Sequence, residues 1–154
     1  MRAVAVVIGV GGALAIATAQ TPQVTSAAEI IAARQQGFKK IGAAFKVIHN
    51  EVGSSSPDAG KIAAAAADIK ASTGVIRSWF PPGSGPQSGL KTHAKPEIWT
   101  DASGFAATRD AYIRQVEKSA RQLGDPSERG AWKDSSTALG QACKDCHDSY
   151  RVKG

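Results

Sequence analysis

Both cysteines of the chain lie in one short segment near its C-terminus, Cys143-Lys144-Asp145-Cys146-His147. A Cys-x-x-Cys pair followed at once by histidine is the attachment motif of c-type haem. In this chemistry two thiols add across the two vinyl groups of one porphyrin, and the adjacent imidazole becomes the proximal ligand of its iron. Residues three and four apart on a helix share a face, so all three side chains can reach one macrocycle. The segment predicts one covalently bound haem c, held by Cys143 and Cys146, with His147 on the iron.

Other uses of two cysteines explain the segment less well. A redox-active dithiol is expected in a βαβ context with its first cysteine at a helix N-terminus, whereas this pair falls late in a helical stretch. A structural zinc site needs four nitrogen or sulfur ligands at short spacing, and the chain has two cysteines and three histidines in all. A disulfide suits an exported protein but leaves His147 without a role. Haem attachment uses all three side chains.

The first 19 residues have the three parts of an export signal. Arg2 supplies positive charge, residues 4–16 are almost wholly apolar or glycine, and Ala17-Thr18-Ala19 has the small-x-small pattern of a cleavage site. The apolar run is short for a transmembrane helix, and no basic stop-transfer cluster follows it. We expect a signal peptide at 1–19 and a mature domain at 20–154 without membrane attachment, with an uncleaved anchor as the alternative. Export fits the motif, because bacteria join haem to such cysteines in the periplasm.

The chain carries a mild excess of positive charge. It has 19 Lys and Arg against 13 Asp and Glu, a net charge of +6, and loss of Arg2 with the signal lowers this to +5. The excess is scattered and lacks the interleaved aromatic residues of a nucleic-acid surface, so nucleic acid is not an expected partner. It favours solubility and, at low salt, docking of an acidic redox partner protein.

Four helical patterns fill the mature chain, and no stretch alternates as a strand does. The expected helices run from a capping box at Ser26 to Val52, from Ser56 to Trp79, from Thr100 or Asp101 to Gly124, and from Ser127 or Glu128 to about Tyr150. Apolar residues recur along each at helical spacing, which gives each helix one face to bury. The pattern predicts a single all-α domain, an antiparallel up-down-up-down four-helix bundle.

Arg34 interrupts the apolar face of the first predicted helix. It lies seven residues before Ile41, in the row that also holds Ile48. A buried guanidinium is costly without a partner, so Arg34 is expected either to meet an anion or to reach water at the end of the bundle. A haem propionate would be a suitable anion.

The segment 81–96, rich in Pro, Gly and Ser, is the one long irregular stretch of the mature chain. Loops of this length in a small domain are usually either functional or disordered. Ile98 and Trp99 follow it closely, so at least its end should pack on the bundle. His93 lies within it and is expected either to touch the edge of a cofactor or to be exposed to solvent.

These features together resemble the cytochrome c′ family, the class II c-type cytochromes. The resemblance extends over nearly the whole mature chain, and it is carried by Arg34-Gln35 with Phe38, by the segment 96–99, Pro-Glu-Ile-Trp, and by the segment 143–151. It implies a four-helix bundle with the haem near the end of the last helix. It also implies thioether bonds at Cys143 and Cys146 and a proximal ligand at His147.

Further roles follow from the same resemblance. Arg34 and Gln35 match residues that lie against the haem propionates in the family, and Phe38 matches the distal position over the open face of the iron. Arg151 matches an arginine that flanks the proximal pocket. His93 falls where the family's loop approaches the haem periphery, although a histidine is not a hallmark there.

The resemblance also bears on the second axial position of the iron. Relatives with methionine there are low-spin electron carriers, and relatives with an aliphatic or aromatic residue are five-coordinate and high-spin. Met1 is the sole methionine and falls in the expected signal peptide, while Phe38 cannot bind iron. His49 lies about three turns beyond Phe38, ~16 Å along the helix, and His93 would have to fold deep into the bundle. The two lysines after Phe38 should point sideways, so we expect a five-coordinate, high-spin iron.

An open iron site behind a phenylalanine favours small neutral ligands, because anions and water lose hydration on entering an apolar pocket. We therefore expect a periplasmic haem protein that binds NO and CO and carries single electrons. A dedicated periplasmic electron-transfer cytochrome without physiological gas binding is the alternative. An enzymatic role is not expected, since no distal His–Arg pair is evident to activate a peroxide. The resemblance also allows a homodimer through the first two helices.

Overall fold

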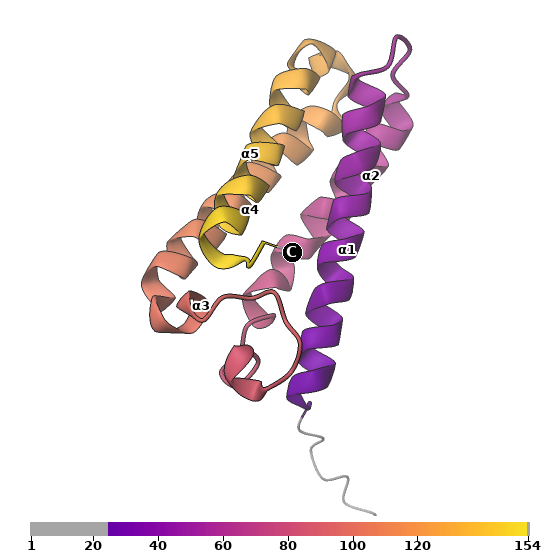
Figure 1. Ribbon diagram of the computed structural model, residues 1–154. Helices are drawn as coiled ribbons and strands as arrows, with labels where there is room; N and C mark the ends of the chain where they lie inside the picture. Colours follow the sequence, from indigo (N-terminus) through magenta and orange to yellow (C-terminus); the bar gives the residue numbers. More distant parts are fainter. Residues whose placement is uncertain (1–24, 154) are drawn as a thin grey trace, which may run out of the picture.

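The computed structural model describes residues 25–153. Four long α-helices run alternately up and down: α1 (Ala27–Val52), α2 (Ala59–Ala71), α4 (Ala102–Gly124) and α5 (Trp132–Tyr150) (Figure 1). A single-turn helix, α3 (Glu97–Thr100), precedes α4, and 3₁₀ turns occur at Ser72–Gly74, Ile76–Ser78, Pro86–Ser88 and Pro126–Ala131. Within 25–153 there is no strand beyond an isolated β-bridge. The predicted all-α, antiparallel four-helix bundle is confirmed.

The predicted signal peptide at 1–19 lies outside the described residues. In the described part of the chain, no helix combines the length and the apolar character needed to cross a membrane.

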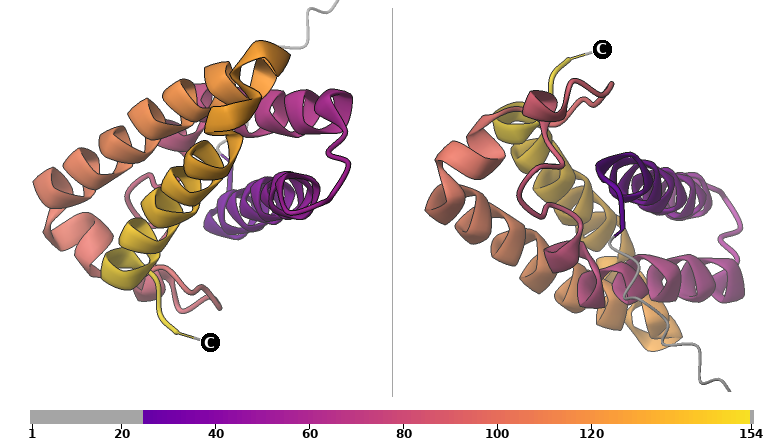
Figure 2. Two further views of the ribbon diagram at one scale, coloured as in Figure 1. Left: turned by 90° about the horizontal axis from the view of Figure 1, so that it is seen from above. Right: turned by 90° about the horizontal axis from the view of Figure 1, so that it is seen from below.

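The helices do not pack equally on all sides of the bundle. Helix α4 packs against both α2 and α5, and α1 packs mainly against α2. Helices α1 and α5 make far fewer contacts with each other, although they face one another across the bundle (Figure 2). The candidate site lies between these two helices.

The main core lies toward the end of the bundle that holds the α1–α2 turn and the 3₁₀ turn Pro126–Ala131. Five of its largest side chains are at most 2% exposed: Ile48, Ile62, Ile69, Leu123 and Trp132. Each comes from the predicted apolar face of its helix. Burying a side chain of this size contributes roughly 1.5–3 kcal/mol to stability, so this cluster fixes how the helices face one another.

Side-chain caps set where the helices begin. The predicted capping box is present, since the Ser26 amide donates to Glu29 Oε2 at 2.8 Å and the Glu29 amide donates to Ser26 Oγ at 3.3 Å. Of the two predicted starts of this helix, Thr100 and Asp101, Asp101 is the cap of α4, accepting from the Gly104 amide at 3.0 Å. The predicted cap of the second helix at Ser56 is wrong. Asp58 takes that position, because its carboxylate accepts from the Lys61 amide at 3.0 Å.

Two further helix boundaries differ from the prediction. The second helix does not continue to Trp79 but ends at Ala71, where the hydroxyls of Ser72 and Thr73 donate to the carbonyls three residues earlier at 2.6 and 2.8 Å. Hydroxyls that take up backbone carbonyls in this way compete with a regular helix. The fourth helix begins at Trp132, because the preceding turn is 3₁₀ and Glu128 has a non-helical backbone. The 3₁₀ turns after α2 bring Trp79 next to α1.

Candidate haem-binding site

A cavity of about 790 Å³ lies between α1 and α5, close to the C-terminal end of the chain. All eight residues predicted for the site line it: Arg34, Gln35, Phe38, His93, Cys143, Cys146, His147 and Arg151. They come from α1, the loop 81–96 and the end of α5. Ligand cavities in proteins measure roughly 300–1,000 Å³, so this space suits a large organic cofactor.

The wall formed by α5 carries the two thiols. Cys143 and Cys146 lie one turn apart, both are partly buried, and they are not bonded to each other. Burial raises the pKa of Cys143, and burial together with the neighbouring Cys143 raises the pKa of Cys146 to about 11. Redox-active dithiols depend on a lowered pKa at one cysteine. The environment of this pair therefore argues against the redox-dithiol interpretation.

His147 follows the thiols on the same wall and is open to solvent on part of its surface. Partial burial lowers the pKa of its imidazole, and the Arg151 guanidinium lowers it further, whereas Asp148 acts in the opposite direction. The imidazole is therefore neutral at neutral pH, which is the form that binds a metal.

The wall formed by α1 presents the apolar side chains of Phe38, Ile41 and Phe45 to the cavity, and Arg34, Gln35 and Lys39 of the same helix also line it. The Phe38 ring packs edge-on against Trp79, with centroids 4.9 Å apart, and lies 6.2 Å from Phe80. Aromatic contacts continue from Phe80 to Phe105 and Tyr150, which close the far side of the cavity. Such walls suit the flat apolar faces of a porphyrin.

Arg34 is buried, with 3% of its surface exposed, so the prediction that it could reach water at the end of the bundle is wrong. Its guanidinium donates to the Trp79 carbonyl at 3.0 Å, to Ser84 Oγ and O at 3.2 and 3.0 Å, and to Thr92 Oγ1 at 3.0 Å. These acceptors are neutral, and no carboxylate of the described chain pairs with it. Burial correspondingly lowers the pKa of Arg34. The hydrogen bonds tie the loop 81–96 to α1.

The same loop is also tied to the end of the chain. The Val152 amide donates to the His93 carbonyl at 2.8 Å, and the Lys95 amide donates to the Tyr150 carbonyl at 3.0 Å, on either side of an antiparallel bridge between Ala94 and Arg151. His93 is solvent-exposed, as one of the two expectations had it, and it also lines the cavity. Nearby, Gln35 Nε2 donates to the Lys91 carbonyl at 3.4 Å. The loop and the tail thus form one rim.

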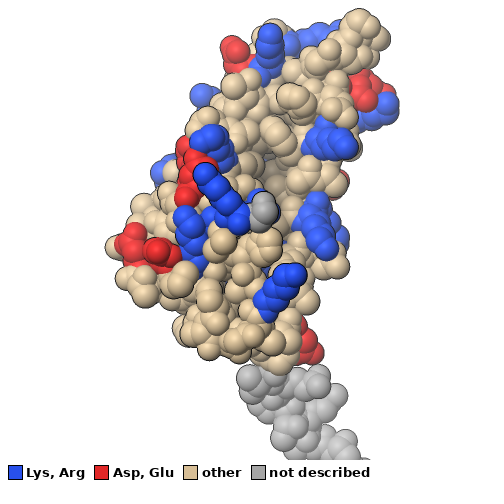
Figure 3. Space-filling model, in the orientation of Figure 1, with Lys and Arg blue, Asp and Glu red and all other residues tan. Residues whose placement is uncertain are grey.

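Positive charge predominates around the cavity. Its lining residues include five Lys or Arg and two His, and no Asp or Glu of the described chain is among them. Lys and Arg side chains surround the C-terminal end of the chain on this face (Figure 3). The carboxylates of a haem would find favourable partners here. Apolar walls, two neutral thiols, a neutral imidazole and a cationic rim together fit a haem.

Sequence reasoning missed several of the lining residues. Lys39 was expected to point sideways and instead lines the cavity, as do Lys91 of the loop and Arg109 of α4. The acceptors of Arg34, Ser84 and Thr92, were not foreseen either. Two features of the sequence pointed to a contact between α1 and the loop: the charged Arg34 in the apolar face of the helix, and the length of the loop. Helical periodicity, however, cannot predict which loop residue contacts a buried arginine.

Comparisons with known proteins agree with this geometry. The family model "Cytochrome C′" matches residues 29–151. Cytochrome c′ of Rubrivivax gelatinosus is 36% identical over 74 residues, which are 46% of this chain and 54% of that protein, so the chain spans about half the length of this curated relative. The crystal structure of the Rubrivivax gelatinosus protein superposes with a TM-score of 0.74 at 30% identity, covering 84% of this chain and 99% of the other.

Two further solved structures are similar. One is a nitric oxide complex of a variant of cytochrome c prime from Alcaligenes xylosoxidans, with a TM-score of 0.75, 25% identity and coverage of 86% and 100% of the two chains. The other is a cytochrome c′ described as having a ligand-controlled dimer dissociation, with a TM-score of 0.76, 26% identity and coverage of 85% and 100%. With a family model matching most of its length and a cavity that fits the cofactor, the chain belongs to the cytochrome c′ family of haem proteins.

Proposed function

We propose that this protein is a periplasmic c-type cytochrome that carries one haem, keeps the second axial position of the iron open behind Phe38, binds NO and CO, and exchanges single electrons. The observation that supports this most directly is the unequal chemistry of the two cavity walls. Helix α5 supplies two thiols and an imidazole, whereas α1 supplies no sulfur atom and no imidazole and places Phe38, Ile41 and Phe45 beside Arg34, Gln35 and Lys39.

The roles of the α5 residues follow from their spacing and environment. Cys143 and Cys146 would hold the haem through thioether bonds, and His147 would be the proximal ligand. The bound haem supplies a redox-active iron with a position for a small ligand. Arg151, on the rim beside His147, lies where it can act on a ligand that approaches from the proximal side.

The opposite wall supports an open iron site. Among the described residues that line the cavity, the only sulfur atoms are those of the two cysteines. His93 is held at the rim by its backbone bond to Val152. His49 is exposed near Phe45, with ring centroids 6.3 Å apart, and does not line the cavity. These positions favour a five-coordinate, high-spin iron.

An apolar distal wall selects among ligands by their hydration. The side chains of Phe38, Ile41 and Phe45 offer no hydrogen bond to an anion or to water, so these species would lose solvation beside them without compensation, whereas NO and CO are small and neutral. The NO complex of the Alcaligenes xylosoxidans variant supports gas binding by analogy.

The cations around the cavity support a second set of roles. Arg34 is a buried charge whose four acceptors are all neutral, so a propionate in the cavity would stabilise it. Gln35 lies one residue further along α1, on the same cavity, and could donate to the same group. The remaining cations of the rim favour an acidic redox partner. The ligand-controlled dimer of a relative makes a homodimer a reasonable expectation for this chain too.

A dedicated electron-transfer cytochrome is the alternative. This alternative would need the same haem site. The apolar side chains of Phe38, Ile41 and Phe45 favour gas binding over a role in electron transfer alone. Fast reduction by a cognate partner in a strain that shows no NO phenotype would support the alternative instead.

The distal assignment can be tested by introducing a ligand for the iron. Replacing Phe38→Met in the purified holoprotein should shift the optical spectrum toward the low-spin, six-coordinate form, because a thioether would then face the iron. Phe45→Met is the matched control, since it changes the same residue type on the same cavity wall two turns away and should leave the spectrum high-spin. Identical spectra for both variants and the wild type would contradict the proposal, as would an intact mass without one added haem.

A further inference from the structure

Trp79 is held by three residues of α1 that share one helical face. The guanidinium of Arg34 donates to its carbonyl at 3.0 Å. Its indole lies over Gly37, where a Cβ atom would come within 2.3 Å of indole Cη2. Its ring edge meets Phe38 at a centroid distance of 4.9 Å and an interplanar angle of 77°. Three contacts therefore fix Trp79 against α1: the hydrogen bond to its carbonyl, the space left by the missing side chain of Gly37 (the Gly37 notch), and the ring contact with Phe38.

The absence of a side chain at Gly37 is what permits this arrangement. A Cβ atom at 2.3 Å from a rigid ring carbon cannot be accommodated without moving the ring. The notch therefore lets the indole approach the helix backbone closely enough to touch Phe38, the next residue.

Trp79 contacts Phe38 but does not itself line the cavity. Phe38 does line it, and Phe80 lies on a second side of the Phe38 ring at 6.2 Å. A ring that swings away from the cavity needs free volume behind it, and the indole fills the volume on its side. Close packing of this kind restrains the motion of an aromatic ring.

We propose that Trp79 is a positioning residue that sets how fast small gases reach the distal face of the haem, because it restrains the Phe38 ring. The inference rests on the proposed function, in which Phe38 covers the open side of the iron. Its new content is that the rate is controlled from outside the cavity, by the contact between Trp79 and the α1 segment 34–38.

The chain contains a matched control for this tryptophan. Trp99 is also partly buried and also fills a glycine notch, since a Cβ atom at Gly85 would come within 2.6 Å of its ring. Its indole N–H donates to the Pro81 carbonyl at 3.1 Å, and its ring contacts Phe80 at 6.3 Å. It has no aromatic contact with Phe38. Removing Trp99 should therefore cost comparable packing without freeing Phe38.

The test measures CO association with the ferrous holoprotein by stopped flow or flash photolysis. Trp79→Leu should raise the association rate constant roughly two- to tenfold, the range that corresponds to losing one edge-to-face aromatic contact. Trp99→Leu should leave it within experimental error of the wild type. Trp79→Phe keeps a smaller ring and should give an intermediate association rate constant. If Trp79→Leu yields no folded holoprotein, the rate of Trp79→Phe tests the positioning role instead.

Two readouts separate positioning from a general loss of structure. In a Phe38→Ala background, adding Trp79→Leu should change the CO rate no further, because the ring that Trp79 restrains is gone. Crystal structures should show Phe38 in more than one rotamer in Trp79→Leu and in one rotamer in Trp99→Leu.

The outcomes distinguish failure of the positioning role of Trp79 from failure of the proposed function. If Phe38→Ala binds CO faster but neither Trp79 variant does, the positioning role is overturned and the proposed function stands. Equal acceleration by Trp79→Leu and Trp99→Leu would also overturn the positioning role. If Phe38→Ala itself leaves the rate unchanged, both the distal assignment and the inference that rests on it fail.

Discussion

At the end of the bundle that holds the α1–α2 turn, the helices meet around fully buried side chains such as Ile62 and Leu123, whereas toward the other end α1 and α5 surround a cavity of about 790 Å³. We call these the closed end and the open end. The closed end is complete by itself. The open end depends on the loop 81–96, on Arg34, and on whatever fills the cavity.

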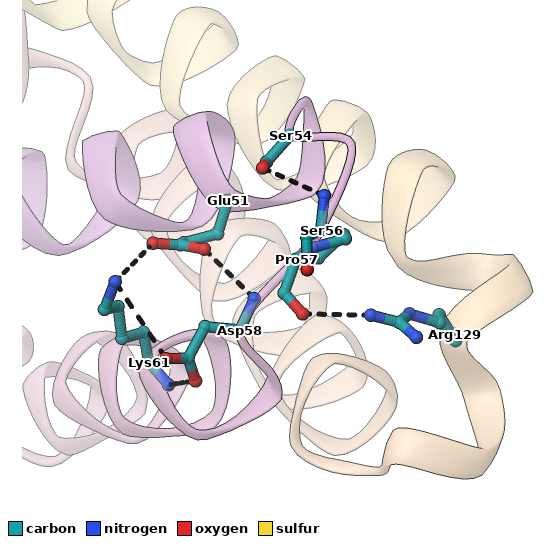
Figure 4. A network of polar contacts seen from close by, with 7 residues as sticks. All are labelled: Glu51, Ser54, Ser56, Pro57, Asp58, Lys61 and Arg129. Carbon is teal, nitrogen blue, oxygen red and sulfur yellow. Dashed lines mark hydrogen bonds and ion pairs between the residues drawn. The ribbon is translucent and has the colours of Figure 1, made fainter.

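Polar contacts differ between the two ends as well. At the closed end they form a surface network, in which Glu51 accepts from the Asp58 amide and from Lys61 Nζ, each at 3.0 Å, and Arg129 donates to the Pro57 carbonyl at 2.9 Å (Figure 4). At the open end the corresponding role belongs to Arg34, which is buried and bonds to neutral acceptors of the loop. One four-helix bundle thus combines a closely packed core at the closed end with a cavity at the open end whose lining suits a large cofactor.

The largest effect should come from removing the cofactor. Replacing both Cys143→Ala and Cys146→Ala abolishes covalent attachment and removes the haem that the cavity walls would pack against, so we expect the free energy of unfolding to fall by more than about 5 kcal/mol, the upper figure for the cavity left by one large side chain. Hydrogen exchange should rise most in the loop 81–96 and the last turns of α5, and it should rise less at Ile48 and Ile62, where only the loss of global stability acts. Uniform loss of protection along the chain would contradict the division into two ends.

A cavity made at the closed end should affect stability alone. Ile62 is fully buried, so Ile62→Ala should lower the free energy of unfolding by roughly 2–5 kcal/mol. Chemical denaturation measures this loss, and the visible spectrum of the folded variant reports on the haem. The spectrum should match that of the wild type, and a changed spectrum at full folding would mean that the two ends are not separable.

Arg34 acts as a clamp at the open end, because it ties the loop 81–96 to α1, and removing it should have a smaller and more local effect on stability. Arg34→Met keeps an apolar side chain of similar length but leaves the acceptors of Ser84 and Thr92 without their donor, so we expect a loss of roughly 1–3 kcal/mol. Arg34→Lys is the control, because it keeps the charge without the planar fork and should recover part of the stability. Faster exchange at the closed end in Arg34→Met would argue against a local clamp.

The smallest effect should come from the surface network of the closed end. The Asp58 amide, and then Lys61, lower the pKa of Glu51 from the ordinary value of 4.5. Because the folded pKa is the lower one, this carboxylate stabilises the fold above pH 4.5, and its contribution is lost as the pH falls through the folded pKa. Glu51→Gln should therefore be less stable than the wild type at neutral pH, with the difference vanishing in acid. A constant difference across this range of pH, in paired thermal melts, would count against it.

The residues that the sequence could place are those fixed by local spacing. The capping box at Ser26 begins α1, helical periodicity puts Phe38 and Arg34 on its inner face, and the attachment motif carries its own geometry. These local signals place Arg34, Phe38 and the attachment motif on the cavity, whereas Gln35, His93 and Arg151 were assigned through the family resemblance, and all eight line it.

The remaining features depend on contacts between distant parts of the chain. Trp79 fills the notch at Gly37, 42 positions away in the sequence, and Thr92 meets Arg34 across 58. No period in the sequence encodes such pairs. The early end of α2 is a different case, since the hydroxyls of Ser72 and Thr73 compete for its last carbonyls, and that local signal was outweighed by the apolar pattern that continues to Ile76.

The optical spectrum of the ferrous holoprotein, recorded before and after addition of NO or CO, tests the central claim most directly. An iron with one protein ligand should give a five-coordinate, high-spin spectrum that changes on addition of either gas. A low-spin, six-coordinate spectrum before any gas is added would contradict the account, because it would show that a side chain of this protein already occupies the position behind Phe38.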